Sequence, residues 1–289
     1  MSRILERWRE FREWQRRPHQ VAPMSEEHHR CHTCGQEFQG NYCPRCGQSA
    51  QIGRYSFRKA LLLFLDVWGL GNRGMFRTLR DLILRPGYMI RDYLSGMQMA
   101  YFPPFKLFFL LTTLSLVVES GVNLNHVNYF ETSREQVRKG FGASFAEANA
   151  EEQPEEVQKA NQQMEEYGYK AMDYAQMFPN IFTLGLLLVM SGYLYIFFRK
   201  CPNIPDMRFS ELLVALVYTA DMFSVYNVVM EFLCFPYEIQ YASLLLPLLP
   251  LKQMSGFKWW KLLFIVLLVA VMMFLTISIL SVFVVVKNL

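Results

Sequence analysis

The sequence contains no secretory signal peptide and none of the common catalytic motifs. Its first seventeen residues mix arginine, glutamate and apolar side chains and lack the continuous apolar stretch of a signal peptide. There is no phosphate-binding glycine loop, no HExxH helix and no GxSxG turn. Lysine and arginine exceed aspartate and glutamate by only four over 289 residues, so overall charge does not indicate nucleic-acid binding. We therefore expect a protein that is not an enzyme and whose partners are not nucleic acids.

Charged residues are also missing from several long stretches. The chain is 52% hydrophobic and 15% aromatic, and its mean hydropathy is +0.11. Apolar runs of about eighteen residues or more predict transmembrane helices. The predicted fold class is an all-α polytopic integral membrane protein of about five spans, near residues 103–120, 178–198, 210–233, 237–251 and 262–286. The fourth is short and contains Pro247 and Pro250, so it either crosses the bilayer or re-enters it.

The two ends of the predicted bundle carry opposite charge. Residues 1–104 hold sixteen basic and nine acidic side chains, whereas residues 119–177 hold five basic and eleven acidic ones. Because basic residues stay on the cytoplasmic side of a membrane, we expect the N-terminus in the cytoplasm. The acidic, helix-prone loop 119–177 is then extracytoplasmic. The side of the C-terminus depends on whether the fourth span crosses.

Four of the six cysteines lie within sixteen residues, as Cys31-x-x-Cys34 and Cys43-x-x-Cys46, and a glycine follows each pair. Two such pairs at this spacing supply the four thiolates of a tetrahedral structural zinc site. The spacing predicts a zinc ribbon at residues 31–48, in a reducing compartment where thiols persist. Since four thiolates complete the coordination of zinc, the nearby His28, His29 and His32 are expected to be solvated. Cys201 and Cys234 are interpreted as small apolar filler.

Two basic, amphipathic regions flank the predicted ribbon. Residues 1–30 are interpreted as a helix with a linker; the helix places Ile4, Leu5, Trp8, Phe11 and Trp14 near one face. That face lies either in the lipid headgroups or against protein. Residues 54–104 are interpreted as interfacial helices. Their arginines are candidates for binding lipid headgroups, or are solvated cations of the inner side: Arg73, Arg77, Arg80, Arg85 and Arg91.

One carboxylate falls inside a predicted span. Asp221 lies near the middle of residues 210–233, and Tyr218, Tyr226 and Asn227 are close enough along the helix to donate hydrogen bonds. A charge at bilayer depth costs several kcal/mol and marks a functional position. The alternative is a hydrogen-bonded side chain that fixes helix packing. Asp221 is therefore a candidate for an intramembrane polar site.

A series of motifs links the ribbon to the first span. It comprises CxxCGQ and YCPRCGQ in the ribbon, then Arg77-Thr78-Leu79, Arg85-Pro86-Gly87, Arg91 to Gly96, Tyr101 and Pro103-Pro104-Phe105. In this order and spacing the chain resembles a family of uncharacterised membrane proteins of Bacteroidetes-type bacteria, the domain of unknown function 3667. The resemblance covers about the first hundred residues. It implies a zinc ribbon on a polytopic inner-membrane protein, and it implies no activity.

The sequence thus divides into residues 1–30, the ribbon 31–48, the interfacial region 54–104 and a transmembrane domain 105–289. The leading hypothesis is an inner-membrane accessory or scaffold protein that contacts membrane lipids and docks partner proteins through the ribbon and the acidic loop. The alternative is a transporter or channel for a small solute or ion, with Asp221 and the proline-broken span at its core. A lipid-modifying enzyme on the basic region is a third, weaker hypothesis.

Overall fold

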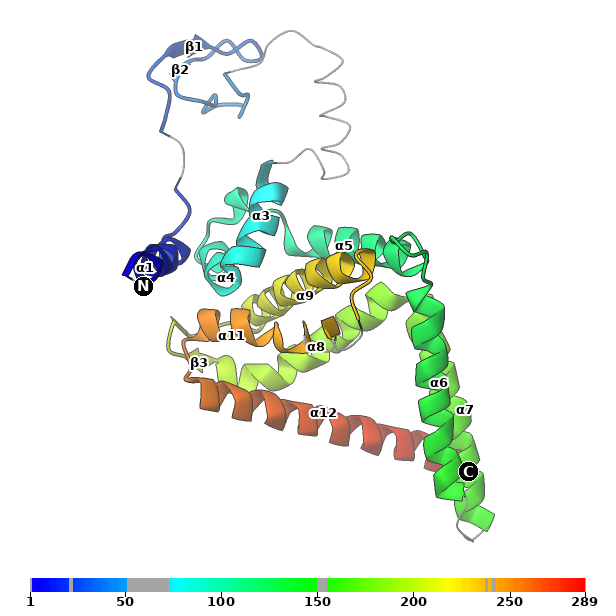
Figure 1. Ribbon diagram of the computed structural model, residues 1–289. Coiled ribbons are helices and arrows are strands. Elements are labelled where there is room, and N and C mark those ends of the chain that lie inside the picture. The colour runs from blue at the N-terminus through cyan, green and yellow to red at the C-terminus, as the bar shows by residue number, and fades with distance from the viewer. Residues whose placement is uncertain are drawn as a thin grey trace.

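The chain forms a helical body with a small separate ribbon (Figure 1). The computed structural model describes residues 2–20, 23–50, 73–149, 155–236, 239–240 and 243–288. The elements are α1 (Ser2–Arg16), β1 (His28–Arg30), β2 (Glu37–Gln39), α3 (Arg73–Leu84), α4 (Pro86–Leu94), η1 (Gln98–Ala100), α5 (Pro104–Glu119), α6 (Tyr129–Asn149), α7 (Glu155–Met177), α8 (Pro179–Phe198), β3 (Lys200–Cys201), β4 (Ile204–Pro205), α9 (Phe209–Phe232), η2 (Ser243–Leu245), α11 (Leu248–Ser255) and α12 (Trp259–Asn288). The first part of the predicted interfacial region, residues 54–72, lies outside the described residues.

Four helical segments of the described chain are long and apolar enough to cross a membrane: Gln98–Glu119, Pro179–Phe198, Phe209–Phe232 and Trp259–Ile279. A helix of about twenty residues spans the roughly 30 Å hydrocarbon core of a bilayer. The core of the body lies between α5, α8 and α9, where α5 and α9 make the most extensive contact. In contrast, α12 leaves Phe264, Leu267 and Phe274 largely exposed, as expected of side chains that face lipid. The prediction of a mainly helical fold with several helices able to span a membrane is confirmed.

The segment predicted as the fourth span is not one long helix. Its described part forms η2 and the eight-residue α11. Pro247 and Pro250 explain the interruption, because proline has no backbone N–H to donate and disrupts the helical turn before it. Asn227 of α9 accepts a hydrogen bond from the Ser243 hydroxyl at 3.3 Å, which ties η2 to α9. The number of bilayer crossings stays a prediction.

The helical body has two different ends. Helices α1, α3, α4 and α11 gather at the end where α5 and α12 begin, and the hairpin of α6 and α7 lies at the other end, where it contacts α12 (Figure 1). Arg134 and Arg138 of α6 pair with Asp173 of α7 at 3.5 and 3.6 Å. The Phe141 ring lies directly against Gly168, so a side chain at this position would displace the ring. These two helices form the loop that the sequence predicts to be helical and acidic.

The contact between α4 and α11 depends on Gly87. A Cβ atom at this position would lie 2.5 Å from the Pro250 carbonyl oxygen and 2.7 Å from the Met254 nitrogen. The Gly87 N–H also donates to the Gln253 side chain at 3.0 Å. The absence of a side chain therefore allows α11 to approach the first turn of α4.

We expect Gly87→Ala to destabilise the protein by about 1–3 kcal/mol, because the added methyl group forces α4 and α11 apart. Thermal unfolding in detergent measures the change. Gly185→Ala in α8 is the matched control, since nothing lies within 4 Å of its Cβ position. Equal melting temperatures for the two variants would show that the α4–α11 contact is not as close as the structure has it.

Candidate metal centre and buried ion-pair cluster

The ribbon is built from two copies of the same turn. Strands β1 and β2 pair antiparallel and flank the first turn, β1 before it and β2 after it. In the first copy the Gly35 N–H donates to the Cys31 carbonyl oxygen at 2.9 Å, and in the second the Gly47 N–H donates to the Cys43 carbonyl oxygen at 2.9 Å. Both glycines have positive φ, +71° and +74°, which other residues rarely adopt. The repeated Cys-x-x-Cys-Gly sequence therefore produces two matching turns whose thiols converge.

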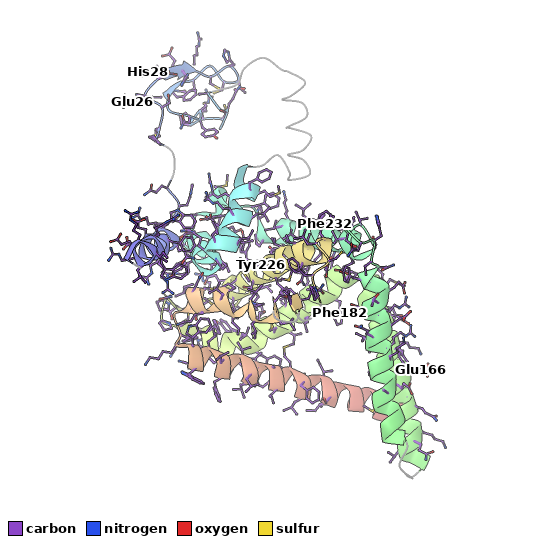
Figure 2. The ribbon with its side chains drawn as sticks, viewed as in Figure 1. Glu26, His28, Glu166, Phe182, Tyr226 and Phe232 are labelled. Atoms are coloured by element: carbon purple, nitrogen blue, oxygen red, sulfur yellow. The ribbon has the colours of Figure 1, made fainter. Side chains whose placement is uncertain are left out.

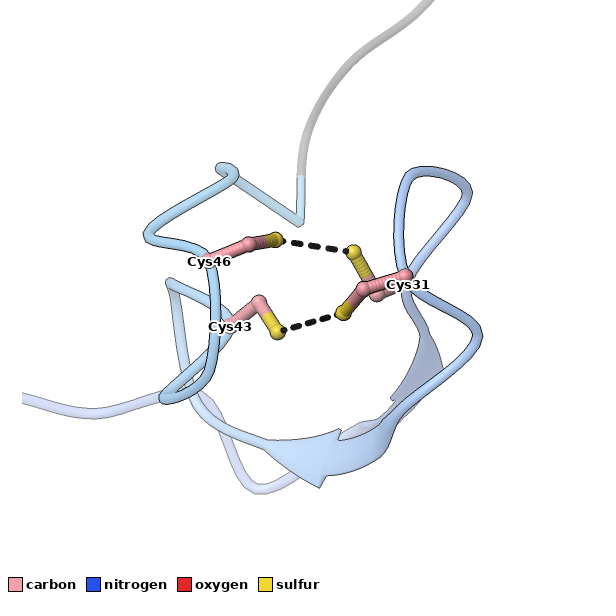
Figure 3. A group of neighbouring side chains, drawn as sticks. Cys31, Cys43 and Cys46 are labelled. Atoms are coloured by element: carbon pink, nitrogen blue, oxygen red, sulfur yellow. Dashed lines mark hydrogen bonds between the residues drawn. The ribbon is translucent and has the colours of Figure 1, made fainter.

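The four thiols lie close enough to share one metal ion (Figure 3). The Cys31 and Cys46 sulfurs are 3.4 Å apart and the Cys34 and Cys43 sulfurs 3.6 Å apart, and all four lie within 4.8 Å of one another. A tetrahedral site with metal–sulfur bonds of about 2.3 Å has sulfurs roughly 3.8 Å apart. The geometry therefore fits a four-thiolate metal site, formed by the cysteines that the spacing predicts.

Local hydrogen bonds favour the thiolate form of Cys31, whereas hydrogen bonds from the other thiols and burial raise the pKa of Cys46. Backbone N–H groups, that of Cys34 first and then that of Thr33, lower the pKa of the Cys31 thiol to about 6, against the opposing effect of burial. The neighbouring histidines do not join the cluster. The His29 ring lies 5.7 Å from the Phe38 ring, and His28 and His32 are exposed. The donor set of a bound metal would therefore be four cysteine sulfurs.

A second polar cluster lies where α3 meets α4, around Arg85. Its side chain is only 4% exposed. The guanidinium pairs with Asp81 of α3 at 3.5 Å and with Asp92 of α4. Because arginine stays charged in proteins, this guanidinium needs its two buried carboxylates.

The same side chain also holds α1. Arg85 donates to the carbonyl oxygens of Gln15, at 3.1 Å, and of Arg17. These carbonyls belong to the C-terminal end of α1, where partial negative charge favours a cation. The Gln15 side chain donates in turn to the Leu84 carbonyl oxygen at 2.6 Å. One face of α1 therefore rests on protein, while Ile4, Leu5 and Trp8 stay exposed.

The cluster continues into the membrane-spanning helices. The Tyr101 hydroxyl donates to Asp92 at 3.1 Å, and the Thr78 hydroxyl accepts from the Phe102 N–H at 2.8 Å. The Phe102 carbonyl oxygen accepts from the Tyr218 hydroxyl of α9 at 2.7 Å. A continuous polar path thus runs from α1 to α9.

The sequence analysis missed Asp81 and the pairing of Asp92, although Asp81 and Arg85 have the i, i+4 spacing of a helical ion pair.

The five arginines predicted to bind headgroups lie in different surroundings. Arg85 is enclosed by protein, as described. Arg77 donates to the Ala100 carbonyl oxygen at 3.1 Å, and Arg80 pairs with Asp81 at 2.8 Å with its side chain 55% exposed. Arg91 borders a separate cavity of about 450 Å³ between α4 and the β3–β4 turn. Arg73 begins α3, and its side chain lies outside the described ones.

The four residues of the predicted intramembrane site do not meet at one point. Asp221 is fully buried, and neither of its carboxylate oxygens has a hydrogen-bond partner among the described residues. Tyr218 is engaged with Phe102 and Asn227 with Ser243, and Tyr226 is half-buried. An apolar cavity of about 330 Å³ lies between α8, α9, α11 and α12. Pro247 borders this cavity and Asp221 does not.

Comparison with known protein families matches part of the chain. A family model described as a protein of unknown function (DUF3667) matches residues 72–116, which confirms the resemblance over α3, α4 and most of α5. The matched residues include Arg77, Arg85, Gly87 and Tyr101, and the four cysteines lie before them. No curated protein and no solved structure matches the chain.

We expect the purified protein to carry about one metal ion per chain, as one four-thiolate site requires. Replacing both Cys31 and Cys34 by serine removes half the ligands, so metal measured by mass spectrometry should fall nearly to zero. Circular dichroism should show the helices unchanged, because the ribbon has its own small core. Cys201→Ser with Cys234→Ser is the matched control and should keep the metal. Full metal content in the Cys31 and Cys34 variant would exclude this site.

We expect Arg85→Met to cost about 3–5 kcal/mol, because it leaves the largely enclosed Asp92 carboxylate without its cation and the buried Asp81 with Arg80 alone. It should also free α1, which limited proteolysis detects as early cleavage near residue 17. Arg138→Gln removes a pair whose side chains are 41% and 51% exposed, so its cost should stay below about 1 kcal/mol. Similar unfolding curves for the two variants would contradict the role assigned to Arg85.

Proposed function

We propose that this protein is a bacterial inner-membrane accessory protein that docks partner proteins on both sides of the membrane. In this proposal a zinc ribbon at residues 31–48 is the cytoplasmic docking module, and the hairpin of α6 and α7 is the extracytoplasmic one. The observation that carries the proposal is the closed cysteine cluster. A site whose four positions are all thiolates has no open position for substrate or water, as in structural zinc modules.

The position of the ribbon supports a docking role. Its core of Cys31, Phe38 and Cys43 is separate from the core of the helical body. Figure 2 shows Glu26 and His28 on the ribbon, away from Tyr226 on α9 and Glu166 on α7. The Tyr42 side chain is 66% exposed, so an aromatic ring is available to a partner at the ribbon surface.

The hairpin supports the second docking surface. Residues 119–177 carry six more acidic than basic side chains. Along this acidic surface Tyr174 and Met177 are 68% and 67% exposed, and such groups are enriched at the centres of protein interfaces. An acidic surface with exposed aromatic groups suits a basic partner.

The charge distribution supports the orientation. The basic helices α1 and α3 lie at one end of the body and the acidic hairpin at the other, which agrees with a cytoplasmic N-terminus. A transport role has less support, because Asp221 does not border the cavity beside the proline-broken segment. Zinc fits the four-thiolate donor set better than hard cations do.

The test places a photo-crosslinking residue at Tyr42 or at Tyr174 in the full-length protein in cells. We expect each position to capture its own protein in near-stoichiometric yield, because the two surfaces lie in different compartments. The Tyr42 product should vanish when Cys31 and Cys34 are changed to serine, while the Tyr174 product should persist. Mass spectrometry identifies both products.

Trp260, at the start of α12 and 86% exposed, is the control position and should give lipid adducts. The docking proposal fails if Tyr42 gives no protein adduct, or if its adduct is unchanged after loss of the cysteines. It also fails if an impermeant thiol reagent labels a cysteine introduced at Tyr42 from outside intact cells.

A further inference from the structure

A pocket of about 330 Å³ lies between α1 and α3. Arginines supply most of its charge: Arg17 from the end of α1, Arg77 and Arg80 from α3, and Arg85 at its inner side. Asp81 is the carboxylate in the lining, and it pairs with Arg80 and Arg85. Among the described residues, no ion pair joins Arg17 or Arg77 to a carboxylate. The pocket therefore keeps an excess of positive charge.

His19 reports on the charge of this pocket. Burial lowers the pKa of the imidazole, and the nearby Arg77 guanidinium lowers it further. Asp81 and Asp92 act in the opposite direction and do not reverse the shift. The arginines thus outweigh the carboxylates at this point, and the pocket is suited to an anion.

The fixed orientation of two arginines in the pocket favours a phosphate group. The Arg80 guanidinium carbon lies 5.9 Å from the centre of the Trp14 ring, so an aromatic face helps to orient this guanidinium. Arg77 is held by its bond to the Ala100 carbonyl oxygen. Guanidinium groups with fixed orientation bind phosphate through paired hydrogen bonds.

The location of the pocket indicates the source of that phosphate. Ala100 lies in the first three residues of the candidate span Gln98–Glu119, so Arg77 sits where the first span enters the membrane. The exposed Ile4, Leu5 and Trp8 of α1 are the side chains that an interfacial helix inserts among lipids. Phospholipid headgroups are the phosphates present at this depth.

We propose that the pocket between α1 and α3 binds the phosphate of an anionic phospholipid headgroup. Arg77 and Arg80 donate to the phosphate oxygens, and Arg17 closes the pocket from α1. Arg85 does not reach the lipid; it is a positioning residue that holds α1 over α3. Lipid bound here bridges the two helices.

The experiment measures the affinity of the full-length protein in neutral detergent for dioctanoyl phosphatidylglycerol by microscale thermophoresis. Arg77→Gln with Arg80→Gln removes two charges and keeps amide donors for the neighbouring contacts. Because each cation near an anionic lipid contributes about 1 kcal/mol, we expect the affinity to fall roughly tenfold or more. Arg134→Gln with Arg138→Gln in the hairpin changes net charge equally and should leave the affinity within about twofold.

Two further probes separate the sources of phosphate. Dioctanoyl phosphatidylcholine should bind more weakly, and inorganic phosphate should not displace phosphatidylglycerol at equal concentration. Displacement by inorganic phosphate would overturn the lipid assignment in favour of a free-anion site. Equal affinity of the α3 and hairpin double variants would overturn the pocket itself.

A second variant tests the pocket without changing α3, in case the α3 double variant does not fold. Arg17→Gln changes an exposed side chain at the end of α1 and leaves the carbonyl group that Arg85 contacts. We expect it to lower the affinity for phosphatidylglycerol about fivefold with an unchanged melting temperature. An unchanged affinity would contradict the proposal whether or not the α3 double variant folds.

Discussion

The buried guanidinium of Arg85 fixes the geometry on which much of this structure depends. Arginine cannot give up its charge in a protein, so a site that encloses it must supply anions and acceptors. Asp81, Asp92 and two carbonyl groups of α1 do so. The ion pairs of Arg85 with these carboxylates add little net stability, because the cost of desolvating the charges offsets their attraction. Removing one partner is nevertheless costly, because the other charge is left buried and unpaired. The effect of the ion pairs is to specify one arrangement of α1, α3 and α4.

This arrangement extends into the membrane through hydrogen bonds rather than further charges. Thr78 and Tyr218 satisfy the N–H and carbonyl groups of Phe102, just before the helix α5 begins. A backbone without helical partners must find hydrogen bonds when it is buried near a bilayer. The start of α5 is thereby tied to both α3 and α9. The basic pocket between α1 and α3 exists because the Arg85 contacts hold these two helices together.

The features that could be predicted from sequence are local ones. The cysteine spacing identifies four thiols because each pair closes its own turn, and apolar runs identify four of the candidate spans because composition alone decides burial in lipid. The partners of Arg85 depend on how α3 packs against α4. The sequence shows where the arginines are, but it does not show which guanidinium is buried and which is exposed. The sequence leaves open whether the proline-broken segment 237–251 crosses the bilayer or re-enters it, since apolar composition is shared by a spanning helix and a proline-interrupted one.

The ribbon and the helical body are stabilised by different physics, and this difference bears on how the protein could be controlled. In so small a ribbon, metal binding and folding are one event, whereas the body is held by apolar burial and the Arg85 cluster. The ribbon core shares no residue with the main core. If the ribbon binds metal and docks a partner, loss of the metal would remove that surface without loosening the helices. If docking is the function, the supply of metal can turn docking at the ribbon on or off, while the hairpin on the other side of the membrane stays formed.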